Sequence, residues 1–170
     1  MRNYVGAMQK QAYQDELTSV KNVAAYDKKV YDLNQKISAG QAAFAVVMVD
    51  LNQLKEVNDR FGHEKGNIAL QTLCQAVCRL YKHSPVYRIG GDEFVVILEG
   101  EDYDNRDALF QKVQAFERIR DLKAAQPWTQ LAASVGMAVY DKTCDATYQA
   151  VFNRADARMY EQKQHLAPRT

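Results

Sequence analysis

The sequence predicts an α+β domain in which a mostly antiparallel sheet is flanked by helices. Two observations carry this prediction. A continuous apolar run over Ala42–Val49 is typical of a central strand that is covered on both faces, and two short apolar segments joined by paired glycines indicate a hairpin. Segments with helical periodicity precede, separate and follow these strands. The resulting order of helix, strand, helices, hairpin, helix, strand and helix is related to the ferredoxin-like βαββαβ pattern.

Composition limits the classes of function. The 170 residues suffice for one domain with a sizeable core, and 47% hydrophobic and 25% charged residues are ordinary for a soluble globular protein. With 22 basic and 21 acidic residues the net charge is +1, so we expect no binding to nucleic acid and no direct contact with a membrane. We see no apolar run long enough to span a bilayer, no signal peptide and no disulfide framework, and we therefore expect a cytoplasmic location.

The N-terminal part divides into an arm and the start of the domain. Residues 1–14 are helix-prone but carry only a thin apolar stripe. They are interpreted either as the end of a linker helix from an upstream sensor domain or as a capping arm, and the domain proper is expected over 15–170. Asn22 predicts the N-cap of a helix that runs to about Ile37.

The apolar run of the central strand ends abruptly at Asp50. A carboxylate at the end of a buried strand is held rigidly, which suits a metal ligand. The following segment, Leu51–Lys55, is expected to turn into a short helix. Most lysines in such a position are solvated, and this remains the alternative for any role of Lys55.

The remaining elements follow from periodicity and from glycine positions. Gly62 is expected at a helix C-terminus. Gly136, inside a predicted strand, indicates close approach of another backbone or side chain. The segments expected here are an amphipathic helix over Asn67–Tyr81, an acidic loop over 100–105, a helix over 107–123, a strand over 131–140 and a last helix over 144–163.

The hairpin carries the sequence Arg-Ile-Gly-Gly-Asp-Glu-Phe over residues 88–94. The paired glycines predict φ > 0 at both turn positions, with Asp92 and Glu93 at the tip. Two adjacent carboxylates beside the bare backbone of Gly90 and Gly91 suit a platform for metal and phosphate. From these residues alone, an ordinary surface hairpin with solvated acids is an equal alternative.

This heptapeptide resembles the signature of the GGDEF domain, the diguanylate cyclase family, and the similarity extends from about Asp15 to Lys163. The resemblance implies a nucleotidyl-cyclase-like βααββαβ fold. It implies that two GTP are condensed to cyclic di-GMP with release of pyrophosphate, using two Mg²⁺ per active site, with Mn²⁺ as an alternative. It further implies a homodimer and an upstream sensor domain, so that the chain is the cytoplasmic domain of a larger, in some cases membrane-bound, bacterial protein.

The resemblance also implies roles for individual residues. The implied metal ligands are Asp50, the backbone carbonyl of Leu51, Asp92 and Glu93. Asp92 is implied as the proton acceptor, and Glu93 as assisting metal binding. The implied substrate-binding residues are Lys55 and Lys163 at the triphosphate, Asn58 and Asn67 at the guanine, and Gly90 and Gly91 in the turn.

Four departures from the family pattern qualify this assignment. Val23 and Ala167 stand where the family has arginine, and 81–84 lacks the Arg-x-x-Asp motif of product inhibition, so that route of feedback is expected to be missing. Asn67 replaces an aspartate that reads guanine. An amide offers one acceptor and one donor, which complements adenine rather than the two adjacent donors of guanine. We expect weakened or broadened base choice, the alternative being normal selectivity through a repositioned side chain or water.

Three functions are compatible with this sequence. The first is an active diguanylate cyclase. The second is a degenerate domain that binds nucleotide as a regulatory module, and the third is a cyclase that makes a mixed or adenine-containing cyclic dinucleotide. The first is favoured, because the residues tied to metals and bond formation are all present.

Overall fold

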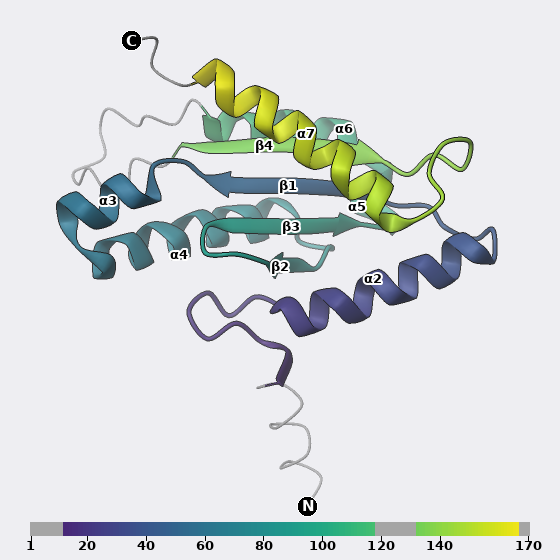
Figure 1. Ribbon diagram of the computed structural model, residues 1–170, viewed down its shortest axis with the longest axis horizontal. Coiled ribbons are helices and arrows are strands. Elements are labelled where there is room, and N and C mark those ends of the chain that lie inside the picture. Colours follow the sequence, from purple (N-terminus) through teal and green to yellow (C-terminus); the bar gives the residue numbers. More distant parts are fainter. Residues whose placement is uncertain (1–11, 118–131, 167–170) are drawn as a thin grey trace, which may run out of the picture.

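The computed structural model describes residues 12–117 and 132–166, and within them an antiparallel sheet forms the centre of the molecule (Figure 1). The strand order is β2-β3-β1-β4 and every neighbouring pair is antiparallel. The predicted α+β class is therefore confirmed. The strands are β1 Ala45–Leu51, β2 Val86–Arg88, β3 Glu93–Leu98 and β4 Ala133–Val139.

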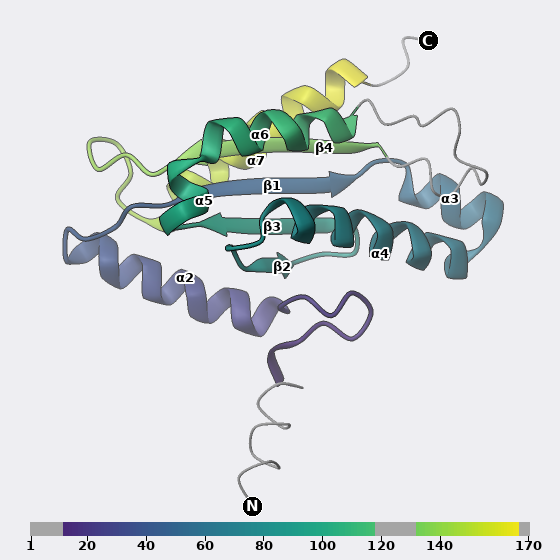
Figure 2. The ribbon, with the colours of Figure 1, turned by 180° about the vertical axis from the view of Figure 1, so that it is seen from behind.

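Helices cover both faces of the sheet. In Figure 1, α2 and α7 lie in front of it, and the view from behind in Figure 2 shows α4 and α6 on the opposite face. None of the helices in the described part of the chain is long and apolar enough to cross a membrane. The helices are α2 Val23–Ser38, α3 Leu54–Phe61, α4 His63–Leu80, α5 Gly100–Asp104, α6 Arg106–Gln114 and α7 Tyr148–Leu166, with the 3₁₀ helix η1 at Ala115–Glu117.

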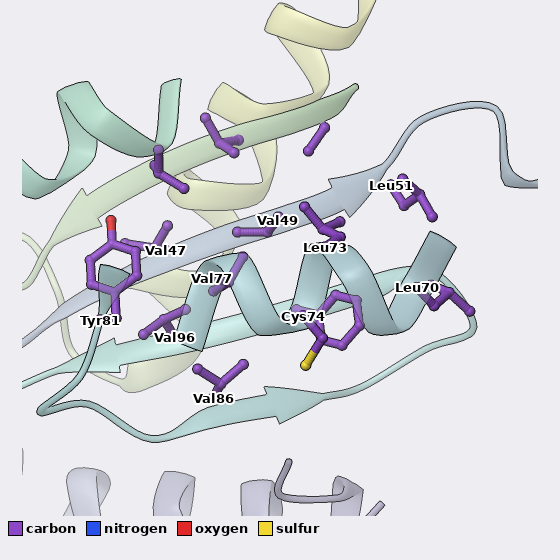
Figure 3. Close-up of a cluster of buried hydrophobic side chains, with 14 of the residues drawn as sticks. Val47, Val49, Leu51, Leu70, Leu73, Cys74, Val77, Tyr81, Val86 and Val96 are labelled. Carbon is purple, nitrogen blue, oxygen red and sulfur yellow. The ribbon is translucent and has the colours of Figure 1, made fainter. Parts of the chain in front are cut away.

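All seven residues of β1 are buried, as predicted for a strand covered on both faces. Successive side chains of a strand point to opposite faces. In Figure 3, Val47, Val49 and Leu51 face the α4 side, where they form a core cluster with Leu73 and Val77. Val46 and Met48, which lie between them in β1, join the second cluster, beneath α2 and α7.

The same alternation places Asp50 on the face covered by α7. Asp50 pairs with Glu93 of β3 on one side and with Ser134 of β4 on the other, so these polar side chains form a row at one end of the sheet. Two residues further along β4, a Cβ on Gly136 would collide with the backbone of Ala155 and Met159 in α7. The close approach predicted for Gly136 is confirmed, and it brings α7 down onto the row.

Several boundaries agree with the sequence analysis. Asn22 caps α2, because its Oδ1 accepts a hydrogen bond from the N–H of Ala25 at 3.0 Å. Gly62 ends α3 with φ +89°, a left-handed value that glycine adopts readily. The buried core face of α7 includes Tyr148 and Met159, as expected.

The hairpin differs from its prediction. Neither Gly90 nor Gly91 has a positive φ, because the connection is not a two-residue turn. Instead the Ile89 N–H donates to the Glu93 carbonyl at 3.1 Å, which leaves Gly90, Gly91 and Asp92 as a three-residue loop. Glu93 is consequently the first residue of β3 rather than part of the tip.

Other predicted boundaries are also wrong. The helix expected from Asn67 begins at His63, because Gly62 ends α3 and starts α4 with no linker between them. The expected acidic loop is the helix α5, since Asp102 is buried and accepts a hydrogen bond from Ser84 Oγ at 2.6 Å. Strand β1 extends through Asp50 to Leu51, and α7 starts four residues later than the expected 144. The predictions for 1–11 and for 118–131 lie outside the described residues.

Candidate active site

Three carboxylates converge at the end of the sheet where β1 leads into α3. Asp50, Asp92 and Glu93 each offer one oxygen, and these oxygens all lie within 4.8 Å of one another. Asp50 and Glu93 are directly paired across β1 and β3. The Leu51 N–H donates to the Asp92 carbonyl at 3.0 Å, and this bond closes the hairpin loop onto the end of β1.

Asp50 is the most buried member of this acidic cluster, with 4% of its surface exposed. Its Oδ2 accepts a hydrogen bond from Lys163 Nζ at 2.9 Å, whereas Oδ1 is buried without a hydrogen-bond partner among the described residues. Burial raises the pKa of Asp50 to about 6; the neighbouring Asp92 adds to the rise, and the contact with Lys163 opposes it.

The charges of the acidic cluster also shift the pKa values of Glu93 and Lys163. Burial, together with the charges of Asp92 and Asp156, raises the pKa of Glu93. The hydrogen bond to Asp50 raises the pKa of Lys163, and the charges of all three carboxylates act in the same direction. One ammonium faces three carboxylates, so the cluster keeps an excess of negative charge.

The donor set fits a hard divalent cation. Mg²⁺ and Mn²⁺ prefer carboxylate and carbonyl oxygens, and the acidic cluster offers several on rigid strand backbone. The partnerless Oδ1 of Asp50 supports this fit, because a buried carboxylate oxygen normally has a partner.

The two signature glycines lie beside the cluster. A Cβ on Gly90 would stand 3.2 Å from Glu93 Oε2, so the backbone of Gly90 runs directly past this carboxylate. Gly91 has open space where its side chain would be. The loop therefore exposes backbone next to the acidic cluster, as a phosphate platform requires.

Arg88 links the hairpin loop to Asp15, and we call this contact the arginine clamp. Arg88 donates to the Gly91 carbonyl at 2.9 Å and to Asp15 Oδ2 at 3.3 Å. Thr18 also donates to Asp15 Oδ2, through its N–H at 2.9 Å and its hydroxyl at 2.6 Å. Burial of Asp15 opposes its ionisation, but the bonds from Thr18 and the charge of Arg88 outweigh this and lower its pKa. Sequence reasoning missed the clamp, because residues 73 positions apart make it.

The predicted base-binding residues gather where α3 packs on α4. Asn58 of α3 places its Oδ1 where a Cβ on Gly66 would be, so Gly66 is the residue that admits this side chain. Asn67 follows Gly66 in α4 and is exposed, as is Lys55 in the first turn of α3. Among the described residues, neither Lys55 nor Asn67 makes an ion pair or hydrogen bond to the acidic cluster. Figure 1 shows α3 directly beyond the end of β1, so this corner and the cluster share one end of the sheet.

The structure thus defines a class of α+β domain that carries a carboxylate site for divalent cations at one end of an antiparallel sheet. Residues 12–168 match the family described as "Diguanylate cyclase, GGDEF domain". The chain belongs to this family.

Curated relatives have related names. The chain is 31% identical over 156 residues to the diguanylate cyclase TpbB of Pseudomonas aeruginosa, covering 88% of this chain and 35% of the relative. It is 29% identical over 171 residues to the diguanylate cyclase DgcP of Escherichia coli, covering 97% of this chain and 48% of the relative. The chain therefore spans less than half the length of these two relatives.

Solved structures share the fold. The GGDEF domain of TpbB from Pseudomonas aeruginosa has a TM-score of 0.72 at 25% identity, covering 89% of each chain. A microbial GGDEF domain described with cyclic di-GMP has a TM-score of 0.70 at 28% identity, covering 93% of this chain and 94% of that one. The coiled coil and GGDEF domain of DgcB from Caulobacter crescentus, in complex with c-di-GMP, has a TM-score of 0.79 at 19% identity, with 96% and 87% coverage, and supports the fold alone.

Proposed function

We propose that this chain is the catalytic domain of a diguanylate cyclase, which condenses two GTP into cyclic di-GMP and releases pyrophosphate. The observation that carries the proposal is the acidic cluster, in which Asp50, Asp92 and Glu93 converge and Oδ1 of Asp50 is buried without a hydrogen-bond partner in the described part of the chain. Three mutually repelling carboxylates are costly without cations, so their convergence supports a metal-dependent site, and turnover distinguishes this function from that of a regulatory module.

The acidic cluster, with the backbone carbonyl of Leu51, would hold two Mg²⁺, or Mn²⁺ in their place. Bound there, the ions would lower the pKa of the attacking 3′-hydroxyl and would neutralise charge on the α-phosphate. Asp92 accepts the proton of that hydroxyl, and Glu93, the first residue of β3, assists metal binding. Their strand and loop positions keep these carboxylates fixed during the reaction.

The remaining residues of the proposed site hold the nucleotide. Lys55 of α3 and Lys163 of α7 contact the triphosphate. Gly90 and Gly91 allow the phosphates to approach the loop backbone. Asn58 and Asn67 contact the base in the α3–α4 corner; Asn58 is held against Gly66, whereas Asn67 is exposed.

Each such site holds one nucleotide, and the product contains two. A second copy must therefore present its own nucleotide across a two-fold axis, so that each 3′-hydroxyl attacks the other α-phosphate. We infer that residues 1–14 link the domain to an upstream sensor domain that sets this homodimer, and that the domain works in the cytoplasm.

A second candidate function is a cyclase with altered base choice. It is favoured by Asn67, whose exposed amide makes no hydrogen bond to another described residue and is available to a base. An amide complements the edge of adenine, so ATP would enter the site more readily than in relatives with aspartate. The product would then be a mixed or adenine-containing cyclic dinucleotide.

Product identification separates these functions. The purified chain, at a concentration where it dimerises, is incubated with Mg²⁺ and GTP, ATP or both, and the products are identified by mass spectrometry. We expect cyclic di-GMP and pyrophosphate, and no product from an Asp92→Asn variant. A mixed dinucleotide would favour the second candidate, and the lack of any cyclic product in every mixture would contradict both.

A further inference from the structure

Lys163 makes a contact that a residue reserved for phosphate would not need. Its Nζ lies 2.9 Å from Asp50 Oδ2, inside the acidic cluster. The Lys163 side chain is 46% exposed, whereas that of Asp50 is 6% exposed, so a partly exposed ammonium covers a buried carboxylate.

The packing of α7 on β4 positions Lys163 for this contact. The missing side chain of Gly136 lets the backbone of α7 approach β4 at Met159. Lys163 lies four residues after Met159, one helical turn further toward the end of the sheet where Asp50 lies, and on the same face of the helix. The position of Lys163 over Asp50 is therefore fixed by backbone packing, not by the side chain alone.

Lys55 provides a natural contrast within the same site. It is an exposed lysine on α3 that has the same proposed role at the triphosphate. In the described part of the chain it makes no ion pair, whereas Lys163 is bonded to a metal ligand. A difference between the two lysines therefore isolates the contact with Asp50 from phosphate binding.

We propose that Lys163 is the counter-ion of the nucleotide-free metal site and competes with the divalent cation for Asp50. This inference rests on the proposed function. A cation that arrives alone must displace the ammonium from Oδ2 and leave it without its partner. A cation that arrives with a nucleotide triphosphate offers Lys163 the phosphate oxygens instead, so Lys163 exchanges one anionic partner for another.

The exchange couples the two ligands. Because the nucleotide stabilises the position of Lys163 away from Asp50, it increases the affinity for the cation, and by linkage the cation increases the affinity for the nucleotide by the same factor. Lys163 thus favours loading of the metal together with its substrate over loading of the metal alone.

Manganese binding tests this proposal without turnover. Free Mn²⁺ is measured by electron paramagnetic resonance during titration of the chain, first without nucleotide. We expect Lys163→Met to bind Mn²⁺ about tenfold more tightly than the unaltered chain, equal to about 1.4 kcal/mol. Lys163→Arg, which keeps the positive charge, is expected to stay within about twofold of the unaltered chain.

The matched control is Lys55→Met, which removes the other proposed phosphate ligand. It is expected to leave nucleotide-free Mn²⁺ affinity unchanged. The titration is then repeated with a GTP analogue that carries a methylene bridge between the α- and β-phosphorus atoms and cannot release pyrophosphate. The analogue should strengthen Mn²⁺ binding in the unaltered chain by a larger factor than in Lys163→Met.

The possible failures are distinguishable. If Lys163→Met binds Mn²⁺ no more tightly than the unaltered chain, the counter-ion role is wrong and the proposed function stands. If the unaltered chain binds no Mn²⁺ even with the analogue, the metal site itself is wrong. Circular dichroism checks that each variant is folded; Lys163→Gln, which keeps a hydrogen-bond donor but not the charge, gives the deciding measurement if Lys163→Met does not fold, with a smaller gain expected.

Discussion

At the scale of the residue, Asp50 is a carboxylate inside a strand whose other residues are apolar and buried. Burial of its apolar neighbours in β1 stabilises the folded protein. The same burial, together with the charge of Asp92, disfavours the ionised form of Asp50. Such a residue favours function at the expense of stability.

Replacement of Asp50 by asparagine should therefore stabilise the cation-free protein. The pKa of Asp50 rises to about 6 on folding, so the ionised form is disfavoured in the native state and its penalty is present at neutral pH. We expect Asp50→Asn to raise the free energy of unfolding by about 2 kcal/mol at pH 7 in the presence of EDTA, measured by urea denaturation. A less stable variant would show that Lys163 more than compensates for the burial.

Base choice is the second property argued from a single residue, and Asn67 is the residue proposed to influence it. Restoring the carboxylate with Asn67→Asp provides an acceptor for both adjacent guanine donors. We expect the ratio of kcat/KM for GTP to that for ATP to rise by about tenfold, equal to about 1.4 kcal/mol, in assays of pyrophosphate release. Equal ratios in the two proteins would show that Asn67 does not read the base. Because Asn67 is exposed, its replacement should leave the thermal stability nearly unchanged.

At the scale of the element, the packing of α7 on β4 positions one side of the site. Gly136→Ala places a Cβ against the backbone of Ala155 and Met159, which cannot move aside as a flexible side chain could. We expect this variant to lose about 3 kcal/mol of unfolding free energy in urea denaturation and to weaken the contact between Lys163 and Asp50.

Gly91→Ala is the matched control, because a Cβ there meets nothing within 4 Å and the φ of Gly91 is not positive. It should change the free energy of unfolding by less than about 0.5 kcal/mol. If both alanine variants were equally stable, the close approach of α7 to β4 would not be a determinant of the fold.

The turn before α2 is the second element that supports the site. Asp15 holds Arg88, which in turn holds the carbonyl of Gly91. The pKa of Asp15 is lowered on folding, so its contribution to stability is fully present above its ordinary value and is lost as the pH falls below about 4.

Asp15→Asn should accordingly lower the free energy of unfolding by about 1–2 kcal/mol at pH 7. The difference from the unaltered chain should shrink as the pH falls below about 4, because Asp15 becomes protonated and is then neutral, like the asparagine. Thermal denaturation over a pH series measures this. A difference that is independent of pH would assign the effect to the shape of the side chain rather than to its charge.

At the scale of the whole molecule, the sequence predicted correctly those features of the fold that depend on short stretches of residues. The buried central strand follows from its apolar run, the cap at Asn22 from its side chain, and the close approach at Gly136 from a glycine inside a strand. The convergence of Asp50 with Asp92 and Glu93 was expected from the resemblance and agrees with the register of β1 and β3.

What the sequence did not predict depends on contacts between distant segments. The three-residue hairpin loop is closed by the bond from the Ile89 N–H to the Glu93 carbonyl, and Glu93 also pairs with Asp50 of the distant β1, which the turn residues cannot reveal. The segment that looks like an acidic loop in the sequence is the helix α5, in which Asp102 accepts a hydrogen bond from Ser84, just before β2. Likewise, the contact of Lys163 with Asp50 spans 113 positions and follows only from how α7 crosses the sheet.

The central claim is that the acidic cluster holds divalent cations over a nucleotide triphosphate. A crystal structure with Mn²⁺ and the methylene-bridged GTP analogue, with the anomalous signal of manganese, tests this claim most directly. The account predicts a manganese peak at about 2.0–2.2 Å from oxygens of Asp50 and of Asp92 or Glu93, with the triphosphate beside the Gly90–Gly91 backbone. A triphosphate bound elsewhere, or manganese that does not touch Asp50, would contradict it.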